Sequence, residues 1–308
     1  MKHVTIGIFH DEKLGKELGK KGTESDLLMF NRKTDDCIYT FISPLEDKLA
    51  PKTQIVSSID AAIINCEQIT PELGETILLL DSAGLKEGIL ICPEYADTTL
   101  IMNTIKETSI KNFIIIDRNI AKIMEILEKI KPERNARSPA IVTTDHSFSV
   151  KGVGEVILGF VKQGTINAHD TMTLLPANKE VMIRSIQMQD KDFDKAEAGC
   201  RVGLAIKGAT VDEMRRGAMF SASNGAKTDK KFTLNFIKNR FYPVLKEGLF
   251  HITVGMQTVP VIVSQINNGS ITIESEKPIA YTAKDSFLLL DLNAKKLHLI
   301  GKGTISNN

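Results

Sequence analysis

The sequence predicts a multidomain chain of class α/β plus β, in which one α/β domain is followed by two β-barrels. Two observations predict this order. In the first part, short apolar runs alternate with segments of helical spacing, which is typical of a mostly parallel sheet covered by helices. After residue 139 the apolar period becomes 2, and the chain turns rich in glycine and β-branched residues, as short barrel strands require.

Five apolar runs predict the strands of the parallel sheet, and two segments between them predict helices. The runs span residues 3–9, 38–42, 61–65, 88–92 and 113–116. One helix begins at Thr70-Pro71-Glu72, where an N-cap hydroxyl, a proline at the first helical position and an early acid favour a start. The other runs from Ile120 to Ile130 and places its apolar side chains on one stripe.

Breaks in these patterns predict the domain boundaries. Prolines and charges interrupt the α/β pattern at residues 131–139, and a polar stretch at 221–231 is predicted to be a second, flexible linker. The predicted domains are an α/β domain over residues 1–133, a first barrel over 138–223 and a second barrel over 228–308. An Asn268-Gly269 pair in the last part predicts a tight hairpin.

Composition and charge exclude several classes of protein. The 308 residues are 42% apolar and 25% charged, with a formal net charge of +1, which fits a globular protein and argues against a blanket polyanion binder. The sequence shows no secretory core and no stretch of about 20 apolar residues, so we expect a cytoplasmic protein with no membrane partner. Four cysteines without a CxxC pair predict buried reduced thiols, and six scattered histidines predict no structural metal.

The order of motifs in the middle of the chain carries a resemblance to a known family. These motifs occupy residues 148–164, 170–176, 181–187, 196–203 and 214–217. In this order they closely resemble the second domain of translational GTPases of the EF-Tu, EF-1α and SelB type, in which this barrel follows the GTPase domain. We interpret Gly152 and Gly154 as a bend or bulge in a barrel strand, because a dinucleotide-binding loop needs a helix after it.

The first domain resembles the GTPase domain of this family, but its phosphate loop is degenerate. Such a loop needs glycines for a tight backbone cradle, a lysine for the phosphates and a hydroxyl for magnesium. Here Gly15-Lys16 is preceded by His10 where the first glycine should stand, and Glu17 replaces the hydroxyl. Lys13 and Lys16 are either remnants of the phosphate-loop lysine or solvated charges on a short loop.

Two further motifs of the family are also degenerate. The magnesium and γ-phosphate motif, Asp-x-x-Gly, becomes Ser43-Pro44-Leu45-Glu46, without its carboxylate and its glycine. The guanine motif, Asn-Lys-x-Asp, becomes Glu94-Tyr95-Ala96-Asp97 and keeps only Asp97. Three lost motifs predict a pseudo-GTPase domain without catalytic residues, in which the GTP and magnesium of related proteins are lost as cofactors.

Residues 241–243, 273–278, 285–290 and 301–304 follow one another in the order of the third domain of the SelB-like branch, which the last segment resembles. With the run Gly19-Lys20-Lys21-Gly22-Thr23 and its short third barrel, the chain resembles archaeal SelB-like proteins of methanogens, some of which are linked by name to pyrrolysine incorporation. From Lys227 onward the sequence contains eleven Lys and Arg residues and six Asp and Glu residues, an excess of five positive charges. This excess indicates either a phosphate-facing surface or a solvated barrel surface. In the family the acceptor end of tRNA meets the second domain, so the resemblance makes Arg184, Gln187 and Arg201 candidate RNA contacts.

Three functions fit these residues. The first is a translation-factor-like protein without nucleotide chemistry that binds tRNA or the ribosome. The second is a functional GTPase with unusual loops that delivers a specialised aminoacyl-tRNA, and the lack of an intact phosphate loop argues against it. The third is a regulatory scaffold that binds another protein and has kept only the fold.

Overall fold

The computed structural model describes residues 1–46 and 48–306, and the chain divides into two compact units. The first unit contains residues 1–132, 238–245 and 288–302, and the second contains residues 133–237, 246–287 and 303–308. The predicted boundaries of the three domains stay a prediction, and the last two residues of the third lie outside the described part. Among the described residues, no helix has the length and apolar character needed to cross a membrane.

The N-terminal domain is built on a seven-stranded sheet with a parallel core. The strand order is β2-β3-β4-β1-β5-β6-β7. The strands are β1 (Lys2–Phe9), β2 (Lys20–Glu24), β3 (Leu27–Lys33), β4 (Cys37–Pro44), β5 (Ala61–Asn65), β6 (Gly88–Ile91) and β7 (Ile114–Ile116). Pairing is parallel from β4 through β1, β5 and β6 to β7, which confirms the expected parallel core. The hairpin of β2 and β3 adds two antiparallel strands beyond β4.

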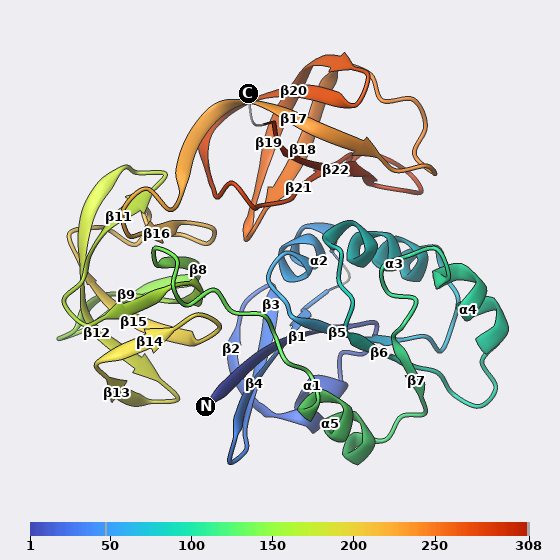
Figure 1. Cartoon of the computed structure of the whole chain (residues 1–308), viewed down its shortest axis with the longest axis horizontal. Coiled ribbons are helices and arrows are strands. Elements are labelled where there is room, and N and C mark those ends of the chain that lie inside the picture. Colours follow the sequence, from blue (N-terminus) through green and yellow to red (C-terminus); the bar gives the residue numbers. More distant parts are fainter. Residues whose placement is uncertain (47, 307–308) are drawn as a thin grey trace. The chain divides into compact units, whose positions relative to one another are not determined.

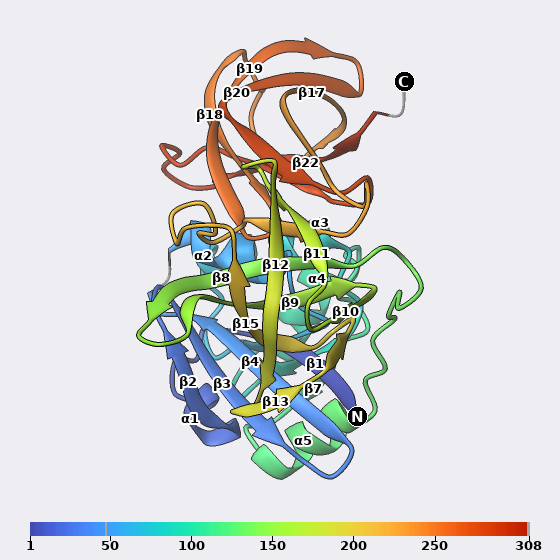
Figure 2. The same ribbon diagram turned by 90° about the vertical axis from the view of Figure 1, so that its left-hand side faces the viewer.

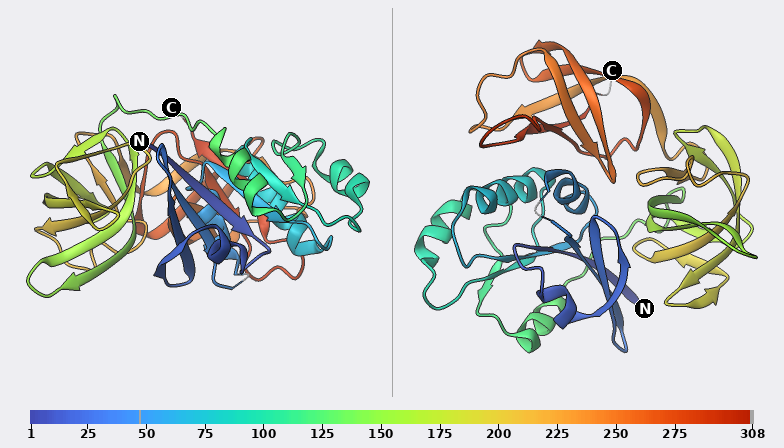
Figure 3. Two further views of the ribbon diagram at one scale, coloured as in Figure 1. Left: turned by 90° about the horizontal axis from the view of Figure 1, so that it is seen from below. Right: turned by 180° about the vertical axis from the view of Figure 1, so that it is seen from behind.

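Helices cover both faces of this sheet. They are α1 (Leu14–Leu18), α2 (Leu49–Val56), α3 (Pro71–Ala83), α4 (Thr98–Ile105) and α5 (Ile120–Glu128). Figure 1 shows α1 and α5 on one face and α2, α3 and α4 on the other, and the right-hand view of Figure 3 shows the same two layers from behind. Buried side chains of α1 and α5 form one apolar core with β1, β4 and β5. Burial of this kind is the main source of stability for such a domain.

Helix α3 begins as its sequence predicts. The Thr70 hydroxyl accepts a hydrogen bond from the Leu73 amide at 3.2 Å, and Pro71 occupies the first helical position. At the other end, Gly84 adopts φ +70, the left-handed conformation in which helices commonly stop.

The middle of the chain forms a sheet that closes on itself. Its strands are β8 (Ile141–Val150), β9 (Gly154–Gln163), β11 (Thr171–Leu175), β12 (Lys179–Met188), β13 (Lys191–Phe193), β15 (Arg201–Lys207) and β16 (Met219–Ser221), with a separate ribbon of β10 (Thr165–Asn167) and β14 (Lys195–Glu197). Because β11 pairs with both β16 and β12, the strands form a ring, seen from the side in Figure 2. Its interior is apolar and includes Val142, Ile183 and Phe220.

The last part of the chain forms a closed barrel of order β17-β20-β19-β18-β21-β22. These strands are β17 (Lys227–Lys238), β18 (Gly248–Val254), β19 (Gln257–Asn267), β20 (Ser270–Tyr281), β21 (Phe287–Leu290) and β22 (Leu299–Ile305). The predicted Asn268-Gly269 turn joins β19 to β20, with Gly269 at φ +78. An α/β domain followed by β-barrels is therefore the fold of this chain.

Two local predictions were wrong. Gly152 and Gly154 do not form a bulge within one strand: β8 ends at Val150 and β9 starts at Gly154, so these residues, with φ of +85 and +103, make the turn of a hairpin. The stretch at 221–231 is not wholly a linker either, because β17 already begins at Lys227 and pairs with β20. Residues 227–231 are mostly exposed in this strand of the closed barrel, and the register of the pairing shifts between Asp229 and Lys231.

Candidate functional site

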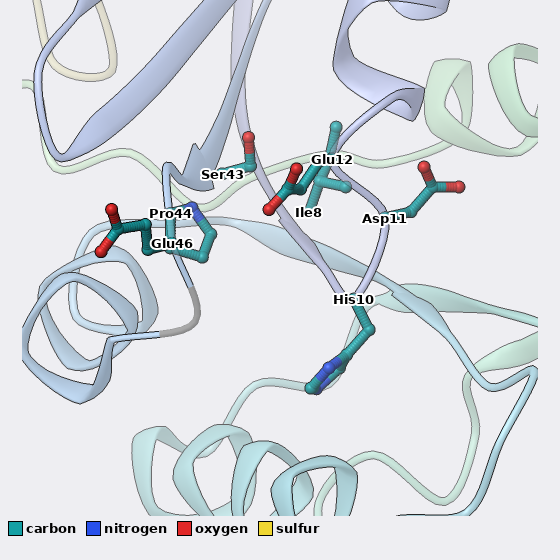
Figure 4. A pocket seen from close by; sticks show the side chains of 7 residues that line it. All are labelled: Ile8, His10, Asp11, Glu12, Ser43, Pro44 and Glu46. Atoms are coloured by element: carbon teal, nitrogen blue, oxygen red, sulfur yellow. The ribbon is translucent and has the colours of Figure 1, made fainter.

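The candidate site of the α/β domain lies at the carboxyl ends of β1 and β4. In the sheet, β1 lies between β4 and β5. Strands β2 to β4 lie on one side of β1 and strands β5 to β7 lie on the other, so the strand order reverses at β1. Ligands of open α/β sheets bind in the crevice at such a point. A pocket of about 300 Å³ opens there, and we call it the switch-point pocket. It is lined by Ile8, His10, Asp11, Glu12, Ser43, Pro44 and Glu46 (Figure 4).

The loop after β1 is organised by the carboxylate of Asp11. Its Oδ1 accepts hydrogen bonds from the backbone amides of Lys13 at 3.0 Å and Leu14 at 2.9 Å, where α1 starts. Amides between a first strand and a first helix are the groups that cradle phosphate in a phosphate loop. Here a carboxylate of the chain already occupies them, so a phosphate would have to displace an anion held within the protein.

Arg118 reaches to this loop from the segment after β7. Its Nε donates to Asp11 Oδ2 at 3.2 Å, and Nη1 and Nη2 donate to the two carboxylate oxygens of Glu17 in α1, at 2.7 and 2.9 Å. The hydrogen bonds from the guanidinium lower the pKa of Glu17, and those to Glu17 raise the pKa of Arg118. Both groups are therefore charged at neutral pH, and together they connect α1 to the carboxyl end of β7.

His10 adopts a backbone conformation that is typical of glycine, and its side chain forms a hydrogen bond within the protein. Its φ is +61, in the left-handed region that glycine adopts without strain. Its Nε2 lies 2.9 Å from the hydroxyl of Thr76, which itself donates to the carbonyl of Glu72 at 2.9 Å. Figure 4 shows the ring turned toward a helix below the loop, which these bonds identify as α3.

The other residues of the three degenerate motifs lie at different places in the α/β domain. Lys13 and Lys16 are exposed around the start of α1, and Gly15 is buried beneath the ring of Phe30. Asp97 caps α4, with its carboxylate accepting from the Leu100 amide at 2.9 Å. Of these motif residues, the last two of β4, Ser43 and Pro44, and Glu46 beyond the strand line the pocket together with the loop after β1. Asp97 is not among the residues that line it.

Gly15, in the first turn of α1, offers a test of whether packing fixes the position of this helix. A methyl group there would overlap the Phe30 ring, so we expect Gly15→Ala to lower the free energy of unfolding of the α/β domain by about 1–3 kcal/mol. The control is Gly74→Ala in α3, where an added methyl meets no atom within 4 Å and should stabilise the helix by up to about 1 kcal/mol. Urea unfolding measures both. Equal effects of the two substitutions would refute the packing role of Gly15.

The three candidate RNA contacts lie on two neighbouring strands of the middle barrel. Arg184 and Gln187 are exposed on β12, where Arg184 Nη1 donates to the Val153 carbonyl at 2.7 Å and Gln187 donates to Asp192 at 2.9 Å. Arg201, on β15, is different: its Nε and Nη2 both donate to Asp145 at 3.2 Å, and Asp145 is buried. The Arg201 guanidinium also lies 5.9 Å from the centre of the Phe160 ring.

Sequence reasoning missed the network of Asp11, Glu17 and Arg118. An aspartate three residues before Leu14 is an N-cap signal, and it would have marked Asp11 as a helix-start residue. Arg118 gave no such signal, because 107 positions separate it from Asp11 and 101 from Glu17. Glu17 was interpreted only as the residue that replaces the magnesium-binding hydroxyl of a phosphate loop.

Comparison with known proteins places this geometry in a family context. The family model for elongation factor Tu domain 2 matches residues 154–221. An uncharacterised protein of Methanocaldococcus jannaschii is 39% identical over 311 residues, which cover 99% of this chain and 100% of that protein. The selenocysteine-specific elongation factor of the same organism is 27% identical over 86% of this chain and 62% of its own length.

Solved structures share the fold of the whole chain. The translation elongation factor SelB of Methanococcus maripaludis, crystallised with the GTP analogue GppNHp, superimposes with a TM-score of 0.86 over 100% of this chain and 79% of that chain. The identity is 22%, so this likeness shows the fold alone. A bacterial selenocysteine-specific elongation factor gives a TM-score of 0.85 over 99% of this chain and 58% of that chain.

Proposed function

Because this chain belongs to the EF-Tu/SelB-type family of translation elongation factors, we propose that it is a SelB-like factor that no longer binds or hydrolyses GTP and that acts on tRNA or the ribosome. The observation that carries the loss of GTP binding is the position of Asp11. Its carboxylate takes the amides of Lys13 and Leu14 that would hold a phosphate.

The charges of the pocket support the same proposal. Phosphoryl groups are held by lysine, arginine and magnesium, which neutralise the charge that they carry. The described residues that line the switch-point pocket include three carboxylates, and none of these residues is a lysine or an arginine. A γ-phosphate at this place would therefore meet like charges and amides that are already occupied.

Binding to RNA is supported by the family and by the charge of the last barrel. The relatives of this chain include a selenocysteine-specific elongation factor and an elongation factor 1-alpha, and the chain from Lys227 onward carries an excess of five positive charges. In the middle barrel, Arg184 is exposed and anchored through only one of its donors, which leaves the rest of its guanidinium open to a phosphate. Gln187 is exposed on the same strand.

A salt series with total tRNA tests this function. Each neutralised phosphate releases counterions, so binding to the intact chain is expected to weaken at least about tenfold between about 50 and 200 mM salt. Arg184→Ala should weaken binding and reduce the slope of log affinity against log salt by about 1. Filter binding measures both quantities.

Lys16→Ala is the matched control, because it removes an exposed positive charge from α1, which belongs to the α/β domain and to neither barrel. It should leave the salt slope unchanged. Weak affinity that does not respond to salt would contradict the RNA proposal and favour a scaffold that binds another protein.

A further inference from the structure

We propose that the loop between β17 and β18 presents Phe241 as a stacking platform for an unpaired base of RNA. This inference rests on the proposed function and deepens it, because it names the kind of RNA that the loop contacts. It begins from two observations: an exposed aromatic ring lies beside an arginine, and the backbone that carries the ring is fixed by hydrogen bonds.

The ring of Phe241 has one face on an arginine and the other toward solvent. The Arg240 guanidinium lies 4.8 Å from the centre of the ring, which is a cation–π contact on one face. Phe241 is nevertheless 61% exposed, so the opposite face is open to a ligand. A nucleobase stacks on such a face whatever its identity, because every base has a π-face, and an adjacent arginine strengthens the contact.

The backbone on both sides of Phe241 is fixed by hydrogen bonds. The backbone amide of Asn239 donates to the Ile300 carbonyl at 2.8 Å, and the side-chain oxygen of Asn239 accepts from the Phe241 amide at 3.0 Å. The Tyr242 hydroxyl donates to Asp291 at 2.8 Å. The ring is therefore held in solvent by an ordered loop, and a ligand that stacks on it does not have to order the loop first.

The charge of the loop favours RNA over an apolar protein surface as the partner. The stretch from Lys238 to Lys246 also contains Arg240 and has no acidic residue, and all three basic side chains are exposed. Lys238 donates to the Tyr242 carbonyl, which does not neutralise its charge. Arg240 pairs with Glu107 at 2.8 Å, where the two side chains are 63% and 60% exposed. An exposed pair of this kind contributes little to stability, so a phosphate next to the stacked base can compete for Arg240.

The geometry of stacking requires an unpaired base. Inside a duplex both faces of a base are covered by the neighbouring pairs, so a protruding ring has no face to contact. Bases in loops, in bulges and at free ends are unstacked, and these are the bases that aromatic side chains bind in RNA. The proposal therefore predicts contact with a loop, a bulge or a free end.

The test is binding of the full chain to a short unstructured oligoribonucleotide that carries 2-aminopurine, a base whose fluorescence changes when it stacks. Phe241→Ala is expected to weaken binding of the single strand about tenfold and to remove the fluorescence change. The slope of log affinity against log salt should stay the same, because no phosphate contact is lost. Phe241→Trp should retain both signals, and binding of the same strand in a duplex should not depend on Phe241.

Val244→Ala is the matched control. Val244 is 78% exposed in the same loop but has no ring, so its replacement should leave the affinity and the fluorescence change as they are. Both substitutions replace exposed side chains, so both variants should remain folded.

Three results would overturn the proposal. Single-strand binding that Phe241→Ala does not change would leave the ring to a protein partner. An equal loss with Val244→Ala would show a general apolar contact, and an equal loss for the duplex would show that stacking is not involved. In each case RNA binding by the intact chain persists, so this inference alone is removed. Absence of salt-dependent binding to both tRNA and the oligoribonucleotide would instead contradict the proposed function, and this inference with it.

Discussion

Replacing Arg201 by alanine is expected to lower the free energy of unfolding of the middle barrel by about 3–5 kcal/mol. Arg201 forms two hydrogen bonds to the carboxylate of Asp145, and the side chain of Asp145 is only 1% exposed. Removing the guanidinium leaves this buried charge without its partner, and a buried uncompensated carboxylate is far less stable than one in water. Thermal or urea unfolding of the variant measures the loss.

Arg184→Ala is the control for this prediction. Arg184 is exposed and donates a hydrogen bond to the Val153 carbonyl, so its removal should change stability by no more than about 0.5 kcal/mol. Two small and equal losses would show that the Asp145 contact contributes little. The difference also matters for RNA assays. Weaker tRNA binding by an Arg201 variant would reflect the lower stability of the barrel, whereas weaker binding by the Arg184 variant would reflect the loss of a surface contact.

Replacing Asp11 by alanine is expected to lower the free energy of unfolding of the α/β domain by about 2–3 kcal/mol. The carboxylate accepts two backbone amides and an Arg118 N–H, and hydrogen bonds to a charged group are the stronger kind. Its loss leaves the amides at the start of α1 without an acceptor. Urea unfolding followed by circular dichroism measures the change.

Glu12→Ala is the matched control for Asp11. It removes a carboxylate from the next position, but one that is exposed and makes no bond within the described ranges, so an effect within about 0.5 kcal/mol is expected. If the two variants unfold alike, Asp11 does not organise the loop. The claim that it stands in place of a phosphate would then lose its basis.

Local patterns in the sequence predicted much of this fold. The cap at Thr70, the turn at Gly269 and the five parallel strands depend on residues next to one another in the chain, and each was confirmed. The hairpin of β2 and β3 was not predicted. Its first strand is largely exposed, with residues such as Lys20 and Lys21, and so shows no apolar alternation.

The candidate site was less predictable, because it depends on contacts between distant residues. The degenerate motifs were visible as single positions, but the bonding of Asp11 involves Arg118, more than a hundred positions away. The hidden hydroxyl of Ser43 likewise depends on packing at the end of β4 rather than on its neighbours in sequence. A motif can be recognised as lost from the sequence, whereas what fills its place follows from the fold.

Calorimetric titration of the intact chain with GTP and magnesium tests the central claim most directly. The filled amides after β1 and the acidic lining of the switch-point pocket predict no binding with a dissociation constant below about 100 μM. The same titration with Asp11→Ala shows whether freeing the amides is enough to restore an anion site. A dissociation constant near 1 μM for the unaltered chain, about −8 kcal/mol of binding free energy, would contradict the account.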